Sequence, residues 1–415
     1  MKIKIKSLFG KQLIIPLSIL LFLALGTIVV ILYGKGYRFG FANGQPKLLG
    51  TGLLVATSLP NGAEVYINGH LTTATDNTIN LAPGEYKVKI FKQGYFPWEK
   101  TIIVQEEVVA KADALLFPTA PQLESITSIG VQSPTVDPSG TQIAYTVASQ
   151  SARKNGVYVL DMSSRPILTL QSASIQVEDD TIDTFSRAQL AWSPDGKQLL
   201  ASISGLLNSP TMYLLSSSSF NQNPQDVTAT LLSVQSEWDR ERKERQRSKI
   251  VGLKPTLQKM ITENFKIIAW SPAPEDTKIL YQASESATLP IIIKPRLIGA
   301  NSTKEERDIK KGEMYVYDIK EDRNYHIDVG EVKFAPQDLS FSSPLRWLPD
   351  SKHLLFVHEK KIDILEYDNT NVTTIYAGPF LDSYVFPWPN GSKILIVTNL
   401  GNPNIPPNLY TISLK

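Results

Sequence analysis

The side chains whose types could support chemistry are few, and the histidines come first among them. The sequence holds 4 histidines and no cysteine, which excludes a thiolate zinc site, an iron–sulfur cluster and a cysteine nucleophile. His353 and His358 are five residues apart in a strand-like stretch, and residues at that spacing point to opposite faces of a strand. We therefore predict no metal site and no cofactor.

Aspartates form the second group, because they recur at one place in a repeated phrase: Asp195, Asp276 and Asp350. Such carboxylates could serve catalysis or bind calcium. However, aspartate is common in turns because its side chain accepts backbone hydrogen bonds, and no Asp-x-Asp-x-Asp-Gly loop occurs. We therefore interpret all three as turn residues.

Tryptophans recur at a second place in the same phrase: Trp192, Trp270 and Trp347. A ligand-stacking ring is one interpretation of this recurrence. Packing between repeats is the simpler one, since a large ring buries much apolar area wherever the repeat places it. The sequence has neither a Gly-x-Ser-x-Gly nucleophile elbow nor a Gly-x-x-x-x-Gly-Lys phosphate loop. We predict no catalytic residue and expect that the protein is not an enzyme.

An arginine-rich run is the third group, and it carries our candidate partner-binding arm: Trp238, Arg240, Arg242, Arg245 and Arg247. Opposite charges four residues apart favour a helix here. A second helix is predicted after Pro255, where apolar residues recur at helical spacing. The helical insertion is expected at about 237–265, with its charged part projecting into solvent and its second helix docked. The alternative to an arm is a solvated surface helix without a partner.

Net charge restricts the class of partner. The chain has 415 residues, with Lys+Arg 42 against Asp+Glu 40. Because nucleic-acid binders usually carry a clear basic excess, we predict no nucleic-acid partner. A hydrophobic content of 42% and this length predict a globular protein of two or three domains.

The N-terminal region predicts a membrane anchor. Residues 12–33 contain no charged side chain, and about 20 apolar residues are enough to cross a bilayer as a helix. We predict a single-pass signal anchor at 12–33 and a cytoplasmic tail at 1–11. Lysines slightly favour the N-terminal side, which predicts an extracytoplasmic bulk. A cleavable signal peptide ending near Ala24-Leu25-Gly26 is the alternative.

Residues 49–118 predict a small all-β domain. Asn68-Gly69 follows a strand-like segment and is a strong hairpin signal, while apolar and charged residues alternate over 85–90. The turn Pro60-Asn61-Gly62-Ala63, the segment 65–69 and the segment 81–88 together resemble the PEGA domain, a bacterial β-sandwich named for a Pro-Glu-Gly-Ala turn. The resemblance implies a non-catalytic module, commonly extracytoplasmic and linked to the cell envelope.

From residue 121 to residue 415 a strand–turn–strand phrase recurs five times, with prolines at 138, 194, 272, 349 and 389. A repeated unit of strands must stack on its neighbours to bury its faces, and four-stranded units around an axis make a β-propeller. The full phrase Trp192–Gly196 resembles the TolB-like and WD40-like propeller repeat. We predict five blades, with a sixth, degenerate blade as the alternative. The strand Ser125–Ile129 is expected to complete the last blade beside Asn408–Ser413.

These observations predict a mainly β protein with an N-terminal transmembrane helix, a PEGA-like β-sandwich and a propeller. The expected function is non-catalytic binding or scaffolding at the cell envelope, with an envelope protein or surface polymer as the partner. The alternatives are the sensor ectodomain of an envelope signalling complex and a propeller enzyme such as a lyase or glycan hydrolase.

Overall fold

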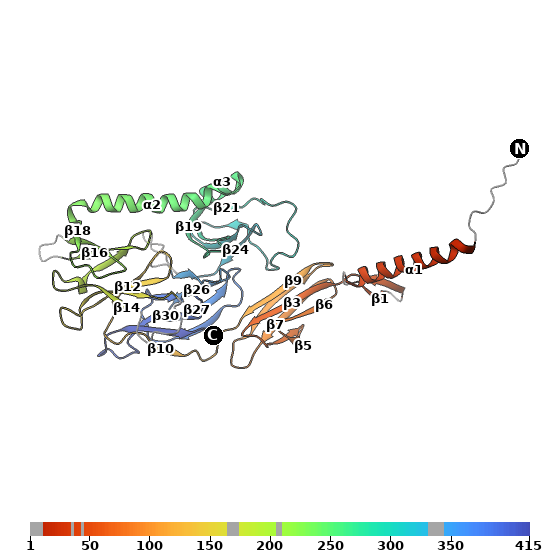
Figure 1. Cartoon of the computed structure of the whole chain (residues 1–415), viewed down its shortest axis with the longest axis horizontal. Helices are drawn as coiled ribbons and strands as arrows, with labels where there is room; N and C mark the ends of the chain where they lie inside the picture. Colours follow the sequence, from red (N-terminus) through yellow and green to blue (C-terminus); the bar gives the residue numbers. More distant parts are fainter. Residues whose placement is uncertain (1–10, 35–36, 43–44, 164–173, 205–209, 331–343) are drawn as a thin grey trace. The chain divides into compact units, whose positions relative to one another are not determined.

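The computed structural model describes residues 11–34, 37–42, 45–163, 174–204, 210–330 and 344–415. Their contacts form two compact units. The first comprises residues of 1–92, 97–116 and 297–303, and the second comprises residues of 93–96, 117–296 and 304–415. The confirmed fold class is mainly β, with one N-terminal apolar helix (Figure 1).

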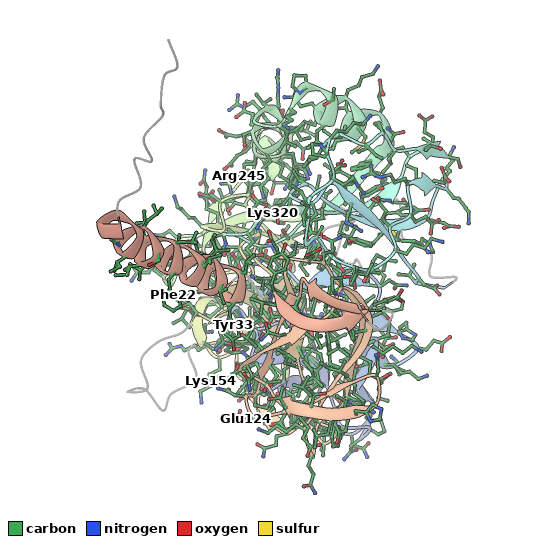
Figure 2. All side chains as sticks on the ribbon, turned by 90° about the vertical axis from the view of Figure 1, so that its right-hand side faces the viewer. Phe22, Tyr33, Glu124, Lys154, Arg245 and Lys320 are labelled. Carbon is green, nitrogen blue, oxygen red and sulfur yellow. The ribbon has the colours of Figure 1, made fainter. Side chains whose placement is uncertain are left out.

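Helix α1 (Lys11–Gly34) is apolar along its length, and its segment Ile15–Gly34 is long enough to cross a membrane. Its serine and threonine hydroxyls bond within the helix, from Ser18 Oγ to the carbonyl of Ile15 and from Thr27 Oγ1 to the carbonyl of Leu23, each at 2.8 Å. The side chains of Phe22 and Tyr33, labelled in Figure 2, are 76% and 65% exposed. Over Ile15–Gly34 the helix therefore presents an apolar surface with its serine and threonine hydroxyls satisfied, as a lipid environment requires.

The β domain that follows α1 contains two sheets. A short antiparallel hairpin, β1 (Arg38–Ala42) and β2 (Gln45–Leu49), precedes it. The three-stranded sheet has the order β6-β3-β9, and the four-stranded sheet has the order β5-β4-β7-β8. Their bounds are β3 (Gly52–Leu59), β4 (Glu64–Ile67), β5 (His70–Ala74), β6 (Asn77–Leu81), β7 (Gly84–Phe91), β8 (Trp98–Val104) and β9 (Val109–Leu115).

Alternation decides which faces of this domain are buried. In β7, Val88 and Ile90 are buried while Lys87 and Lys89 are exposed, which is the pattern of a sheet with one face on the core. The predicted hairpin is confirmed, since Ile67 pairs with His70 across Asn68 and Gly69. Both turn residues have positive φ, 49° and 84°, as a two-residue type I′ turn requires.

The second unit contains five four-stranded antiparallel sheets, which confirm the predicted propeller architecture within the described residues. Four of them are formed by consecutive strands, apart from the insertion within the third. They comprise β11 (Gln132–Val136), β12 (Gln142–Val147), β13 (Gly156–Asp161) and β14 (Ser174–Asp179); β15 (Gln189–Trp192), β16 (Gln198–Ile203), β17 (Thr211–Ser216) and β18 (Gln225–Asp226); β19 (Phe265–Trp270), β20 (Lys278–Ala283), β23 (Met314–Asp318) and β24 (Arg323–Ile327); and β25 (Leu345–Trp347), β26 (His353–His358), β27 (Lys361–Glu366) and β28 (Thr373–Ala377).

The fifth sheet joins segments far apart in the sequence. Its order is β10-β31-β30-β29, with bounds β10 (Leu123–Ser125), β29 (Val385–Pro387), β30 (Lys393–Thr398) and β31 (Asn408–Ser413). Leu123 pairs with Ile412 and Ser125 pairs with Tyr410. The predicted pairing is confirmed, although the strand lies at Leu123–Ser125 and only its continuation covers the expected Ser125–Ile129.

The helical insertion joins the second and third sheets. It contains α2 (Leu231–Val251) and α3 (Pro255–Asn264), preceded by a 3-10 turn at Thr228–Thr230; a further 3-10 turn lies at Phe185–Arg187. Leu257, Met260 and Ile261 of α3 are buried, so the expected docking of the second helix is confirmed. The insertion begins earlier than predicted, because α2 starts at Leu231.

The charged stretch is largely exposed as expected, apart from Trp238, but the expectation that it projects is wrong, since α2 runs from the second sheet to α3 (Figure 1) and contacts both neighbouring sheets. Near its start, Trp238 is buried against Leu200 of β16 and Val227. Near its end, Ile250 packs on the core of the third sheet, and Lys249 Nζ lies 2.9 Å from Asp276 Oδ1. The helix therefore bridges two neighbouring sheets.

Candidate functional site

The predicted partner-binding residues all lie on α2, but they do not share one environment. Trp238 is only 8% exposed, so this member of the predicted arm is a packing residue. The side chains of Arg240, Arg242 and Arg245 are 70%, 49% and 54% exposed, and Arg247 is exposed as well. Figure 2 labels Arg245 on the helix. The four arginines therefore form the accessible part of the predicted site.

Acidic neighbours on the same helix pair with three of these arginines. Arg242 lies 2.6 Å from Asp239, Arg245 lies 2.6 Å from Glu241, and Arg240 lies 3.7 Å from Glu237. Exposed pairs of this kind contribute little to stability, so their charges remain available to an incoming anion. Along the same helix runs a shallow groove of about 560 Å³, lined by Leu232, Gln235, Ser236, Asp239, Arg240, Lys243, Glu244 and Arg247.

The repeated aspartates lie in turns, as predicted. Asp195 Oδ1 accepts hydrogen bonds from Ser193 Oγ at 2.7 Å and from the Lys197 amide at 3.1 Å, and the Ser193 bond lowers the pKa of Asp195. Asp350 Oδ1 accepts the amides of Lys352 and His353. Asp276, at the end of its turn, instead pairs with Lys249 of α2. Each of the three carboxylates therefore has its own local partners.

The repeated tryptophans contribute to packing between sheets. Trp192 and Trp347 are 2% and 6% exposed, and Trp192 Nε1 donates to the carbonyl of Thr135 in β11 of the neighbouring sheet at 3.0 Å. Trp270 is half-buried and lies under the ammonium of Lys249, 5.3 Å from the ring centroid. The packing interpretation therefore accounts for all three.

The histidines of β26 serve two separate carboxylates. His353 Nδ1 lies 2.6 Å from Asp350 Oδ2, while His358 Nε2 lies 2.7 Å from Asp363 Oδ2. Burial acts to lower the pKa of His353, but the hydrogen bond to Asp350 outweighs it and the pKa is raised. In the described part of the chain no three His, Asp or Glu side chains gather in a way that could hold a metal ion.

A buried ionic cluster around Asp322 was not predicted. Asp322 is 0% exposed and lies in the turn between β23 and β24. Its carboxylate accepts the amides of Ile292 and Ile293 at 2.7 and 2.8 Å, and it lies 3.0 Å from Arg307 Nη2. The cluster fastens the insertion between β20 and β23, which also contains the short pair β21 (Ala287–Thr288) and β22 (Asp308–Ile309). Its members are too far apart in the sequence for spacing to reveal it.

Comparison with known proteins identifies the first β domain. The family model described as PEGA domain matches residues 51–119, which confirms the resemblance inferred from its turns. No curated protein matches the chain.

Solved structures give weaker similarities. TolB from Acinetobacter baumannii is 15% identical with a TM-score of 0.23, over 79% of this chain and 60% of that chain. A putative TolB from Agrobacterium tumefaciens is 15% identical with a TM-score of 0.21, over 67% and 70%. An oligogalacturonate lyase in complex with manganese is 8% identical with a TM-score of 0.23, over 80% and 86%. At these scores the likeness carries no argument, so the propeller assignment rests on the five sheets and their repeated turn.

Proposed function

We propose that this protein is anchored in a membrane by α1 and binds or scaffolds a partner at the cell envelope, without catalysis. The observation that carries the proposal is α1 itself, an exposed apolar helix that immediately precedes a PEGA domain. PEGA domains are extracytoplasmic, which supports a cytoplasmic N-terminus and β domains on the outer side.

The proposed binding surface is the set of exposed arginines of α2, with Arg240 and Arg247 on one side of the helix and Arg242 and Arg245 on the other. These arginines are exposed, and they outnumber the acidic side chains that pair with them. They lie on a helix that is held against the sheets at both ends. A fixed helix presents its side chains in one geometry, which lowers the entropy cost of binding. The chemistry favours an acidic partner, either an envelope protein or an anionic surface polymer.

Topology is tested in cells whose outer envelope layers have been removed and whose inner membrane is intact. The full chain is expected to sediment with membranes, and protease added from outside is expected to digest everything beyond residue 37. A protected propeller would reverse the orientation and contradict the proposal.

The surface is tested by changing all four arginines to glutamine, which keeps the helix propensity. Because each exposed pair contributes only a few tenths of a kcal/mol, the melting temperature should change little, while crosslinks to the partner in intact cells should be lost. The control removes three exposed cations of the first unit: Lys87, Lys89 and Lys111. Crosslinks that survive the α2 changes as well as the control would exclude α2 as the binding surface.

A further inference from the structure

A cleft in the propeller unit has the dimensions of a ligand site. Its volume is about 570 Å³, within the range of roughly 300–1,000 Å³ that small-molecule sites occupy. The end of β26, the start of β27, the segment after β24 and the loop before β28 supply its walls. The cleft lies apart from α2 and plays no part in the proposed function.

One side chain of this cleft is a buried carboxylate with an unused acceptor. Asp363 is 7% exposed, and its Oδ2 is 2.7 Å from His358 Nε2. Its Oδ1 is buried and accepts no hydrogen bond from the residues that the structure describes. An unsatisfied buried acceptor destabilises a protein by about 1–3 kcal/mol, and by more when it is charged. A donor supplied by a ligand would satisfy this oxygen.

The charge of the lining selects a cation. Asp328, Glu359 and Asp363 line the cleft, and among the described residues no lysine or arginine does. The neighbouring Lys360 is directed elsewhere, with its Nζ 3.1 Å from Asp382 and 3.0 Å from the carbonyl of Phe380. Lys361 is exposed and does not belong to the lining.

The remaining walls select an aliphatic stem. Val329, Phe356, Leu365 and Val372 line the same cleft, and Phe356 pairs with Asp363 across the two strands. An apolar chain lying on these residues would bring a charged end to the carboxylate. Because His358 already occupies Oδ2, a single oxygen is left, which suits the point charge of an ammonium better than the bidentate fork of a guanidinium.

We propose that this cleft binds a primary alkylammonium group, with the ammonium on Asp363 Oδ1 and its methylene stem on the apolar wall. Such a group is carried by the side chain of a lysine in a peptide and by a free polyamine.

Binding is tested by calorimetry on the full chain in detergent micelles. The probes are Nα-acetyl-lysine methylamide and spermidine, which separate the two sources. The control probe carries an acetyl group on the lysine Nε, so it keeps the stem and loses the charge. We expect saturable binding of at least one cationic probe and at least tenfold weaker binding of the acetylated one. No saturation by either cation, or equal binding of the acetylated probe, would overturn the proposal.

Variants assign the binding to this cleft. Asp363→Asn should weaken it about tenfold or more, since a charged hydrogen bond is lost. Glu359→Gln, at an exposed turn, should weaken the binding about twofold to fivefold through the loss of a nearby charge. This second variant tests the proposal if Asp363→Asn does not fold. Glu275→Gln, an exposed change outside the cleft, is the matched control. Unchanged affinity in folded Asp363→Asn, or in Glu359→Gln, would place the binding elsewhere and overturn the proposal.

Discussion

Two buried carboxylates of the propeller differ because of their hydrogen-bond partners. Asp322 receives backbone amides, a tyrosine hydroxyl and arginine donors. Burial acts to raise its pKa, but these partners outweigh burial and the pKa is lowered. Glu178 is 1% exposed, and its Oε1 accepts a hydrogen bond of 3.1 Å from the Asp179 amide, while Oε2 accepts none from the described residues. Burial and the nearby charge of Asp179 raise the pKa of Glu178 to about 7.

Replacing Glu178 with glutamine should remove a pH-dependent weakness. The folded protein holds the Glu178 proton more tightly than the unfolded chain, so stability should fall as pH rises from about 4.5 to about 7. At pH 8 we expect Glu178→Gln to increase the free energy of unfolding by on the order of 2–3 kcal/mol, and so to raise the melting temperature. At pH 5 we expect little effect. Thermal melts at both pH values measure this. A gain of equal size at pH 5 would assign the effect to packing, and Glu275→Gln should show no gain at either pH.

The helix α2 is an element whose position depends on one residue in a charged run. Glu237–Arg247 contains a single tryptophan among charged and polar side chains, and that tryptophan reaches the second sheet. Without it, only the partly buried Leu231 and Val234 would hold the first half of the helix against this sheet.

Changing Trp238 to alanine should release the first half of α2. Truncation of a buried tryptophan typically costs about 3–5 kcal/mol, and we expect faster amide exchange over residues 231–245 with the end near Lys249 still protected. Leu232→Ala is the matched control, because Leu232 belongs to the same helix but is 82% exposed. Equal exchange in the two variants would show that Trp238 does not hold the helix.

The sequence predicts elements well where the physics is local. The Asn68-Gly69 hairpin and the repeated Pro-Asp-Gly turns depend on neighbours within a few residues, and the apolar face of α3 is visible as a spacing within one helix. It misses features that depend on distant partners. The place of Trp238 is decided by β16 and by Val227, and the Asp322 cluster joins residues from 292 to 322. The open oxygen of Asp363 likewise depends on His358 taking the other one, which spacing alone does not specify.

At the scale of the whole molecule, one sheet joins the two ends of the propeller region. Beyond the paired strands, the amide of Leu409 donates to Thr127 Oγ1 at 2.9 Å, and Asn408 Oδ1 accepts from Thr127 Oγ1 and from the Gly130 amide. These contacts are buried, so they add to the strand pairing in a place that excludes water.

Deleting residues 408–415 should therefore destabilise the propeller as a unit. It removes β31 from the middle of its sheet and leaves the edges of β10 and β30 unpaired. We expect one cooperative thermal transition at a clearly lower temperature than in the full chain. Scanning calorimetry measures this transition. Removing the exposed Lys415 alone is the control. A shortened chain that melts like the full one would show that this sheet does not hold the propeller together.

The same sheet imposes a delay during synthesis. Thr127 leaves the ribosome long before its partner Leu409, because 282 residues separate them. At about 5–20 residues per second, that interval is roughly 15–60 s. During this interval β10 has no partner strand on the edge that β31 later occupies, and this edge can pair with other chains. A nascent chain of this protein therefore needs protection for its first propeller strand until β31 has been made.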